Sequence, residues 1–203
     1  MREVMPVLAL AALLACPGQV ATADFAALLH HCDSCHGQDG ISTDSNVPTI
    51  AGQPEPLIAN AHEQFKDWTR PSSSMPDPGS ARENGDTSMC MVSESLDSIT
   101  INRIAEHYAA RTFRAARQSF DADRAVEGAQ LHQMYCESCH PDGGSRAGYA
   151  GRLAGQWTPY LRRAVAQIRH EEMQVPRIME HKMGEFTVTE IDALLNFWAS
   201  QQE

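Results

Sequence analysis

Apolar residues recur at helical spacing near the end of each half of the chain. The first set is Ile101, Ile104, Ala105 and Tyr108. The second set, 90 residues later, is Ile191, Leu194, Leu195 and Trp198. The members of each set stand at i, i+3, i+4 and i+7, which predicts one buried face of an amphipathic helix. Asp97 takes the cap position of the first helix, and Thr187 with Glu190 forms a capping box before the second.

A second repeat lies further upstream in each half. Ala51-Gly52-Gln53 recurs as Ala154-Gly155-Gln156, followed in both copies by a proline and two apolar residues. Each half is thus predicted to contain an entry helix, a middle helix after Ala-Gly-Gln and a C-terminal helix, with loops between them. Alternating runs of Val, Ile and Thr are absent, so we expect an all-α chain.

The repeat divides the chain into two tandem domains. We predict an N-terminal domain over 24–110, a linker over 111–123 and a C-terminal domain over 124–203. In the linker we expect Arg111, Arg114 and Arg117 to share one solvated helix face. Residues 69–88 are rich in Pro, Ser and Gly and have no copy in the second half, so they are predicted to form a long loop.

Residues 1–23 have the pattern of an export signal. Arg2 precedes the apolar run 5–15, and Ala21-Thr22-Ala23 is a small-x-small cleavage site. The run is too short for a permanent transmembrane segment, so we expect a periplasmic protein. The alternative is a lipoprotein-type cut, since Leu13-Leu14-Ala15-Cys16 would leave a lipid-anchored Cys16.

The formal net charge is −10, with −6 in residues 24–120 and −4 in residues 121–203. Such a chain disfavours binding to nucleic acid and to anionic lipid. It suits a docking partner with a basic patch, although solubility alone explains the charge equally well.

One five-residue motif occurs twice. Cys32-Asp33-Ser34-Cys35-His36 and Cys136-Glu137-Ser138-Cys139-His140 both have the form Cys-x-x-Cys-His, the attachment sequence of c-type haem. We expect Cys32, Cys35, Cys136 and Cys139 to form thioether bonds to two haem c groups. The histidine of each motif then becomes the proximal iron ligand. A zinc site would require further clustered ligands, which the sequence lacks. Cys90 is left over, so there is no disulfide framework.

The repeat also selects a sixth ligand for each iron. Met89 lies 12 residues before Ile101, and Met179 lies 12 residues before Ile191. Both precede a helix cap in what we expect to be a polar loop, so we predict that they are axial ligands. Met91 and Met183 are the alternatives. From the same register, we expect the carbonyls of Pro48 and Gly151 to accept the second ring N–H of His36 and His140.

The paired motifs, the Ala-Gly-Gln repeat and the methionine before each helix resemble the two-haem class I cytochromes c. Within them, the second half is similar to the cytochrome subunit of flavocytochrome c sulfide dehydrogenase. The stretches that carry this similarity are 117–121, 131–140, 153–161, 179–183 and 197–202. The first half departs from the pattern in its long loop and in Cys90. The resemblance implies two tandem class I cytochrome c domains, each wrapped around one covalent haem.

The resemblance also implies a function. Such a subunit accepts electrons from a flavoprotein (FAD) subunit that oxidises sulfide, and passes them to a soluble acceptor. This chain has no Gly-x-Gly-x-x-Gly flavin motif, and we expect no catalytic residue in it. One alternative is a general two-haem carrier that serves a terminal oxidase. The other is a two-haem thiosulfate-oxidising or peroxide-reducing enzyme. Such an enzyme would need an iron with an open sixth position or a thiolate ligand. Cys90 is the candidate thiolate, and His181 competes with Met179 as a ligand.

Overall fold

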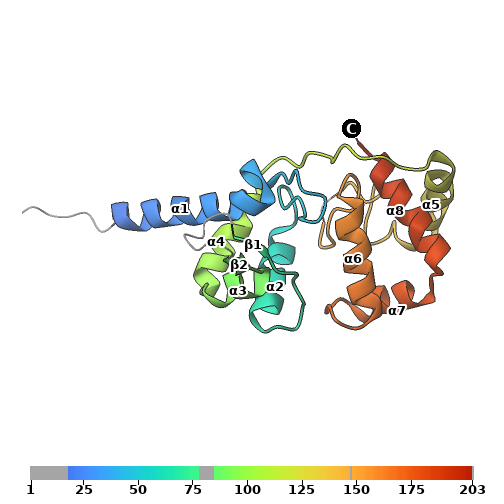
Figure 1. The fold of residues 1–203 in the computed structure, drawn as a ribbon. Helices are drawn as coiled ribbons and strands as arrows, with labels where there is room; N and C mark the ends of the chain where they lie inside the picture. The colour runs from blue at the N-terminus through green and yellow to red at the C-terminus, as the bar shows by residue number, and fades with distance from the viewer. Residues whose placement is uncertain (1–17, 78–84, 147, 203) are drawn as a thin grey trace, which may run out of the picture.

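A computed structural model describes residues 18–77, 85–146 and 148–202, with side chains from residue 24 onward. It contains two groups of helices that lie side by side, joined by one long connecting segment (Figure 1). The first group is α1 (Gly18–His36), the 3-10 turn η1 (Gln38–Gly40), α2 (Glu55–Lys66), α3 (Met89–Glu94) and α4 (Ser98–Ala109). The second group is α5 (Ala122–Tyr135), α6 (Thr158–Arg169), α7 (Arg177–Glu185) and α8 (Val188–Ser200). Two-residue strands β1 (Met75–Pro76) and β2 (Asp86–Thr87) pair antiparallel. The all-α prediction is confirmed apart from this small ladder.

Helices α4 and α8 form as their sequence pattern predicts. All eight residues of the two predicted apolar faces are buried. The carboxylate of Asp97 accepts from the backbone N–H of Thr100 at 2.7 Å. Thr187 and Glu190 exchange both hydrogen bonds of a capping box. These caps satisfy backbone N–H groups that no earlier turn of the helix can pair.

In the second half, α5 packs directly against α8. The close approach requires Gly128, because a Cβ atom at this position would overlap the main-chain carbonyl of Ala193. A glycine inside a helix costs stability relative to alanine, and here it allows two backbones to come together. The crossing brings the second haem motif, at the end of α5, next to α8.

The connecting segment differs from the prediction. Residues 112–121 are not helical, so the three linker arginines do not share a helix face. The backbone of this segment is paired with the second half instead, since the N–H of Ala116 donates to the carbonyl of Gly155 at 2.7 Å. The Gln118 side chain donates to the carbonyl of Gln156 at 2.8 Å. These bonds replace those that a helix would have provided.

Most of the predicted export signal, including Cys16, lies outside the described residues. Helix α1 begins at Gly18 and continues through the predicted cleavage site to His36. None of the described helices is long and apolar enough to cross a membrane.

The Ala-Gly-Gln tripeptides connect each half to its own C-terminal helix. Gly52 and Gly155 have φ values of +64° and +72°, which favour glycine. Their N–H groups donate to the carbonyls of Tyr108 and Trp198 at 2.9 and 2.8 Å. The preceding alanines are fully buried. With the tripeptide fixed in this way, its glutamine is directed at the other half of the molecule.

The packing of α5 on α8 leads to a first prediction. Gly128→Ala should lower the free energy of unfolding by roughly 1–3 kcal/mol, because the added methyl forces two backbones apart. Gly184→Ala in α7 is the matched control, since a Cβ there meets nothing within 4 Å. It should change stability by less than about 1 kcal/mol. Urea unfolding of the haem-loaded proteins measures both. Equal effects of the two substitutions would contradict the crossing.

Candidate haem centres

The first Cys-x-x-Cys-His motif forms the last turns of α1, and the second follows α5 in a turn. Cys32 and Cys35 are partly buried, Cys136 is buried and Cys139 is exposed. None of the described cysteines forms a disulfide, so no disulfide competes for the motif thiols.

The ring of His36 is oriented by the backbone. Its Nδ1 lies 2.9 Å from the carbonyl oxygen of Pro48, as the register predicts. A carbonyl can only accept, so Nδ1 carries the proton and Nε2 keeps its lone pair. Burial lowers the pKa of His36 and the bond to Pro48 opposes this shift. The ring is therefore presented as a neutral imidazole with one free nitrogen, which is the form that binds iron.

The second half repeats this arrangement. The Nδ1 of His140 lies 2.8 Å from the carbonyl oxygen of Gly151, again the predicted acceptor. Burial lowers the pKa of His140 and the bond to Gly151 opposes it. His140 is thus a second neutral imidazole with a free Nε2, in the same tautomer as His36.

The donor set fits covalent haem better than a zinc ion. Burial raises the pKa of Cys32 and of Cys136 to about 11, so both remain thiols rather than metal-binding thiolates at neutral pH. In the described part of the chain, no group of three or more His, Cys, Asp or Glu side chains could hold a metal ion. Two thiols and one imidazole in each motif are the groups that a haem c needs, and these residues would hold it.

In the first half, Tyr108 connects the C-terminal helix to the motif. Its hydroxyl donates to the carboxylate of Asp33 at 2.8 Å and lies 3.3 Å from the carbonyl of Leu29. Sequence periodicity predicted burial of Tyr108 but not this bond. The sequence does contain a pattern that could have indicated it, because the residue after the first motif cysteine is acidic in both halves, Asp33 and Glu137.

In the second half, Trp198 performs the same connection through a histidine. The indole N–H of Trp198 donates to Nδ1 of His132 at 3.0 Å. The Nε2–H of His132 faces the carbonyl of His140 at 2.9 Å and the carboxylate of Glu137 at 3.1 Å. His132 is 1% exposed, and sequence analysis did not identify it. Its network fixes the backbone at the proximal histidine.

The candidate methionines lie in short helices, so the prediction of polar loops was wrong for both. Met89 is the first residue of α3 and Met179 lies within α7, and both are partly buried. Met183 is 1% exposed and belongs to the apolar core, whereas Met91 is 51% exposed. In the register of the C-terminal helices, the first-half counterpart of Met183 is Ser93, which has no thioether. Met89 and Met179 therefore remain the one pair that both halves share.

Another buried histidine, His62, was missed by sequence reasoning. Its Nδ1 lies 2.9 Å from the hydroxyl of Ser93, which connects α2 to the helix that begins at Met89. Burial, with a smaller contribution from His36, lowers the pKa of His62 to about 4. The second half has buried Val165 in the corresponding position. No repeat pattern could have indicated a residue that occurs in one half alone.

Cys90 is 1% exposed and its Sγ lies 3.5 Å from the carbonyl oxygen of Arg70. Burial raises the pKa of this thiol. It is therefore a protonated, enclosed group in the described structure.

The second half also matches a known family. Residues 123–197 match the family described as cytochrome c oxidase, cbb3-type, subunit III. Cytochrome c-552 of Acidithiobacillus ferridurans is 27% identical over 178 residues, which cover 83% of this chain and 73% of that protein.

Solved structures extend the similarity to both halves. Cytochrome c4 of Acidithiobacillus ferrooxidans has a TM-score of 0.68 at 24% identity, covering 84% of this chain and 99% of that chain. Cytochrome c4 of Pseudomonas stutzeri has a TM-score of 0.68 at 20% identity, covering 89% and 98%. The chain has the two-domain class I cytochrome c fold. The predicted cofactor, two covalently bound haem c groups, is confirmed by these comparisons.

A third similar structure has a longer chain than this one. Thiosulfate dehydrogenase (TsdBA) of Marichromatium purpuratum has a TM-score of 0.66 at 24% identity. The match covers 83% of this chain but 36% of that one.

The register and burial of the methionines predict different effects of two substitutions. Met179→Ala should remove roughly half of the weak near-infrared sulfur-to-iron band of the oxidised protein and lower one reduction potential. Met183→Ala should leave the band intact but cost roughly 2–5 kcal/mol of stability, because it opens a cavity in the core. Absorption spectra, redox titration and urea unfolding test both. Loss of the band from Met183→Ala alone would assign the ligand to Met183.

Cys90→Ser should leave the haem spectra and both potentials nearly unchanged, because its thiol faces a backbone carbonyl to which a serine hydroxyl can also donate. Optical and electron paramagnetic resonance spectra of the oxidised protein provide the measurement. Disappearance of a thiolate-ligated signal in the variant would instead identify Cys90 as an iron ligand.

Proposed function

We propose that this cytochrome moves single electrons between a partner oxidoreductase and a soluble acceptor in the periplasm. His36 and Met89 would hold the iron of the first half, and His140 and Met179 that of the second. Bound haem supplies the exchange between Fe(III) and Fe(II). The observation that supports a carrier is the matched pair of buried, neutral imidazoles, each fixed by a backbone acceptor, in two halves that contact each other.

The surrounding residues suit electron transfer rather than substrate chemistry. The acceptor bonds keep each imidazole in one tautomer and one orientation. A thioether from α3 or α7 would close the sixth position, which leaves no site for a substrate on iron. Electron transfer needs little rearrangement, and a fixed pair of ligands provides that.

For the partner, we propose the flavoprotein subunit of a sulfide dehydrogenase. The support is the similarity of five stretches in the second half to the cytochrome subunit of that enzyme, and the lack of a flavin motif in this sequence. The cytochrome c4 and c-552 relatives support the carrier function in general.

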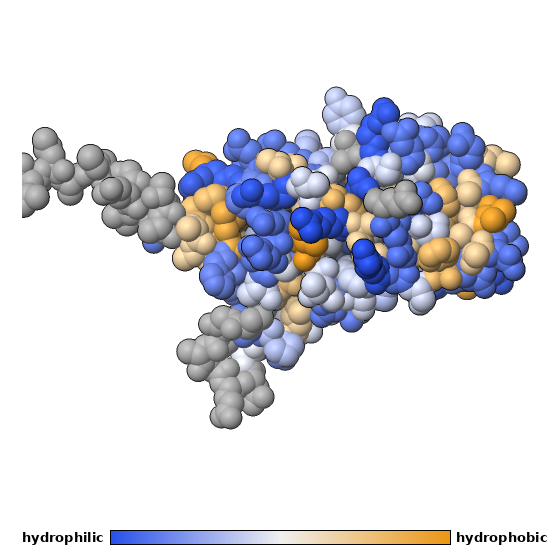
Figure 2. Space-filling view, turned by 90° about the horizontal axis from the view of Figure 1, so that it is seen from above, coloured by the Kyte–Doolittle hydropathy of each residue, from blue (hydrophilic) through white to orange (hydrophobic). Residues whose placement is uncertain are grey.

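The surface is compatible with a charged partner. The face in Figure 2 is largely hydrophilic, with small separate apolar patches over both halves. With a net charge of −10, the chain would be attracted to a basic surface, and salt would weaken that attraction.

A second candidate is the cytochrome module of a thiosulfate-oxidising system. The structural similarity to thiosulfate dehydrogenase TsdBA favours it. As a catalytic centre it would need an open or thiolate-ligated iron. The enclosed position of Cys90, with its Sγ against the carbonyl of Arg70, does not supply the thiolate. We therefore place this candidate second.

Reconstitution separates the two candidates and the general carrier. The isolated cytochrome should accept electrons from dithionite but show no turnover with sulfide or with thiosulfate. Addition of a flavoprotein that copurifies with it should produce sulfide-dependent reduction of the haems. Thiosulfate-dependent reduction by the cytochrome alone would favour the second candidate. If neither sulfide nor thiosulfate reduces the haems, even with the copurified proteins present, the general carrier remains. Rapid sulfide oxidation by this chain without flavin would overturn the carrier function itself.

A further inference from the structure

The two halves exchange matching hydrogen bonds through the glutamines of their Ala-Gly-Gln tripeptides. The side-chain oxygen of Gln156 accepts from the N–H of Thr49 at 3.0 Å, and its amide donates to the carbonyl of Thr49 at 2.8 Å. In return, Gln53 accepts from the N–H of Arg152 at 2.9 Å and donates to its carbonyl at 3.3 Å. Thr49 precedes Gln53 by four residues, as Arg152 precedes Gln156. The contact thus has the self-complementary form of an interface between two copies of one subunit.

One bond of each pair ends on a peptide group whose carbonyl accepts from a predicted iron ligand. The N–H of Thr49 and the carbonyl of Pro48 belong to one peptide, and that carbonyl accepts from His36. Likewise the N–H of Arg152 and the carbonyl of Gly151 form one peptide, which accepts from His140. A continuous path therefore leads from each proximal histidine, through one peptide group, to the glutamine of the opposite half.

Hydrogen bonds in such a path reinforce one another. A peptide whose N–H donates is more polarised, so its carbonyl becomes a stronger acceptor. A stronger acceptor makes the imidazole a more electron-rich ligand, which favours Fe(III) and lowers the reduction potential. We propose that Gln156 and Gln53 are positioning residues that tune the haem of the opposite half, so that each potential depends on contact between the halves.

Burial makes this effect specific to the glutamines. Gln156 and Thr49 are each 2% exposed and Gln53 is 7% exposed, so water is unable to replace a lost side chain readily. The orientation of Gln156 is fixed as well, because its oxygen also accepts from the N–H of Trp157 at 3.1 Å. Two N–H donors on the oxygen leave the amide nitrogen to face the carbonyl of Thr49.

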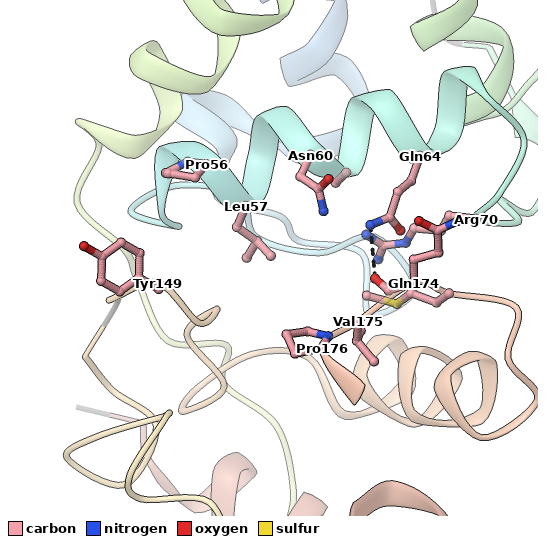
Figure 3. Close-up of a pocket in the computed structure, with 11 residues that line it drawn as sticks. Pro56, Leu57, Asn60, Gln64, Arg70, Tyr149, Gln174, Val175 and Pro176 are labelled. Atoms are coloured by element: carbon pink, nitrogen blue, oxygen red, sulfur yellow. Dashed lines mark hydrogen bonds between the residues drawn. The ribbon is translucent and has the colours of Figure 1, made fainter. Parts of the chain in front are cut away.

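The same interface contains a second pair of matching glutamine bonds, which do not involve the peptides bonded to His36 and His140. These glutamines provide a control. The amide of Gln64 donates to the carbonyl of Gln174 at 3.1 Å, the bond drawn across the pocket in Figure 3. Its counterpart Gln167 donates to the carbonyl of Pro71 at 3.2 Å. These carbonyls belong to segments remote in sequence from both haem motifs. Neither glutamine bonds to the peptide that accepts from His36 or His140, so loss of either weakens the contact between halves without removing a bond to those two peptides.

The test uses haem-loaded Gln156→Met and Gln53→Met, which keep the side-chain length, with Gln64→Met and Gln167→Met as controls. Potentiometric titration, with NMR assignment of each haem, gives the two potentials. In Gln156→Met, the ratio of reduced to oxidised first-half haem at a fixed potential should rise roughly twofold. This corresponds to about 18 mV, since tenfold is 59 mV for one electron. Gln53→Met should change the second-half haem instead, and the controls neither.

A second readout is independent of potential. In reduced protein, the Nδ1 proton of His36 should exchange with solvent faster in Gln156→Met, and that of His140 faster in Gln53→Met. Because the two paths are separate, either one tests the proposal when the other variant does not fold. Equal shifts of both potentials, equal shifts in the controls, or unchanged proton exchange would overturn it. The proposal depends on His36 and His140 as iron ligands but not on the electron donor, so failure of the sulfide assay would leave it standing.

Discussion

The hydrogen bond from each proximal histidine to a backbone carbonyl is the constraint on which the rest of the structure depends. It fixes which nitrogen of His36 and of His140 carries the proton, and so which one is free for iron. A backbone carbonyl is a reliable acceptor only if its loop is held in place. In each half that loop is held by the Ala-Gly-Gln tripeptide, whose glycine is bonded to the end of the C-terminal helix.

The two halves meet this constraint with the same backbone but with different side chains. Tyr108 reaches Asp33 directly, whereas Trp198 reaches the second motif through His132. Both solutions connect an aromatic residue of the C-terminal helix to the haem motif, and both leave no buried donor on that aromatic unpaired. Because main-chain geometry sets the position of the predicted iron ligand, the side chains that support it differ between the halves.

Much of this organisation could be predicted from the sequence, because a repeat reports each feature twice. The haem motifs, the buried helix faces, the caps and the carbonyls of Pro48 and Gly151 all follow from register. Other features did not, and three of them show why. The linker is extended because the second half supplies partners for its backbone, and the methionines lie in short helices that local pattern did not indicate. His132 acts through contacts between elements far apart in the chain, which spacing does not encode.

The differences between the halves bear on the proposed electron transfer. Two centres in series direct electrons only when their surroundings differ, and the polarity of the site is one means by which a protein sets a haem potential. In the first half, the helix that begins at Met89 packs through the polar pair His62 and Ser93. In the second half, the corresponding positions are Val165 and Met183, both in the apolar core. The backbone symmetry thus brings together two similar centres, and this exchange of a polar for an apolar pair is one of the differences between their environments.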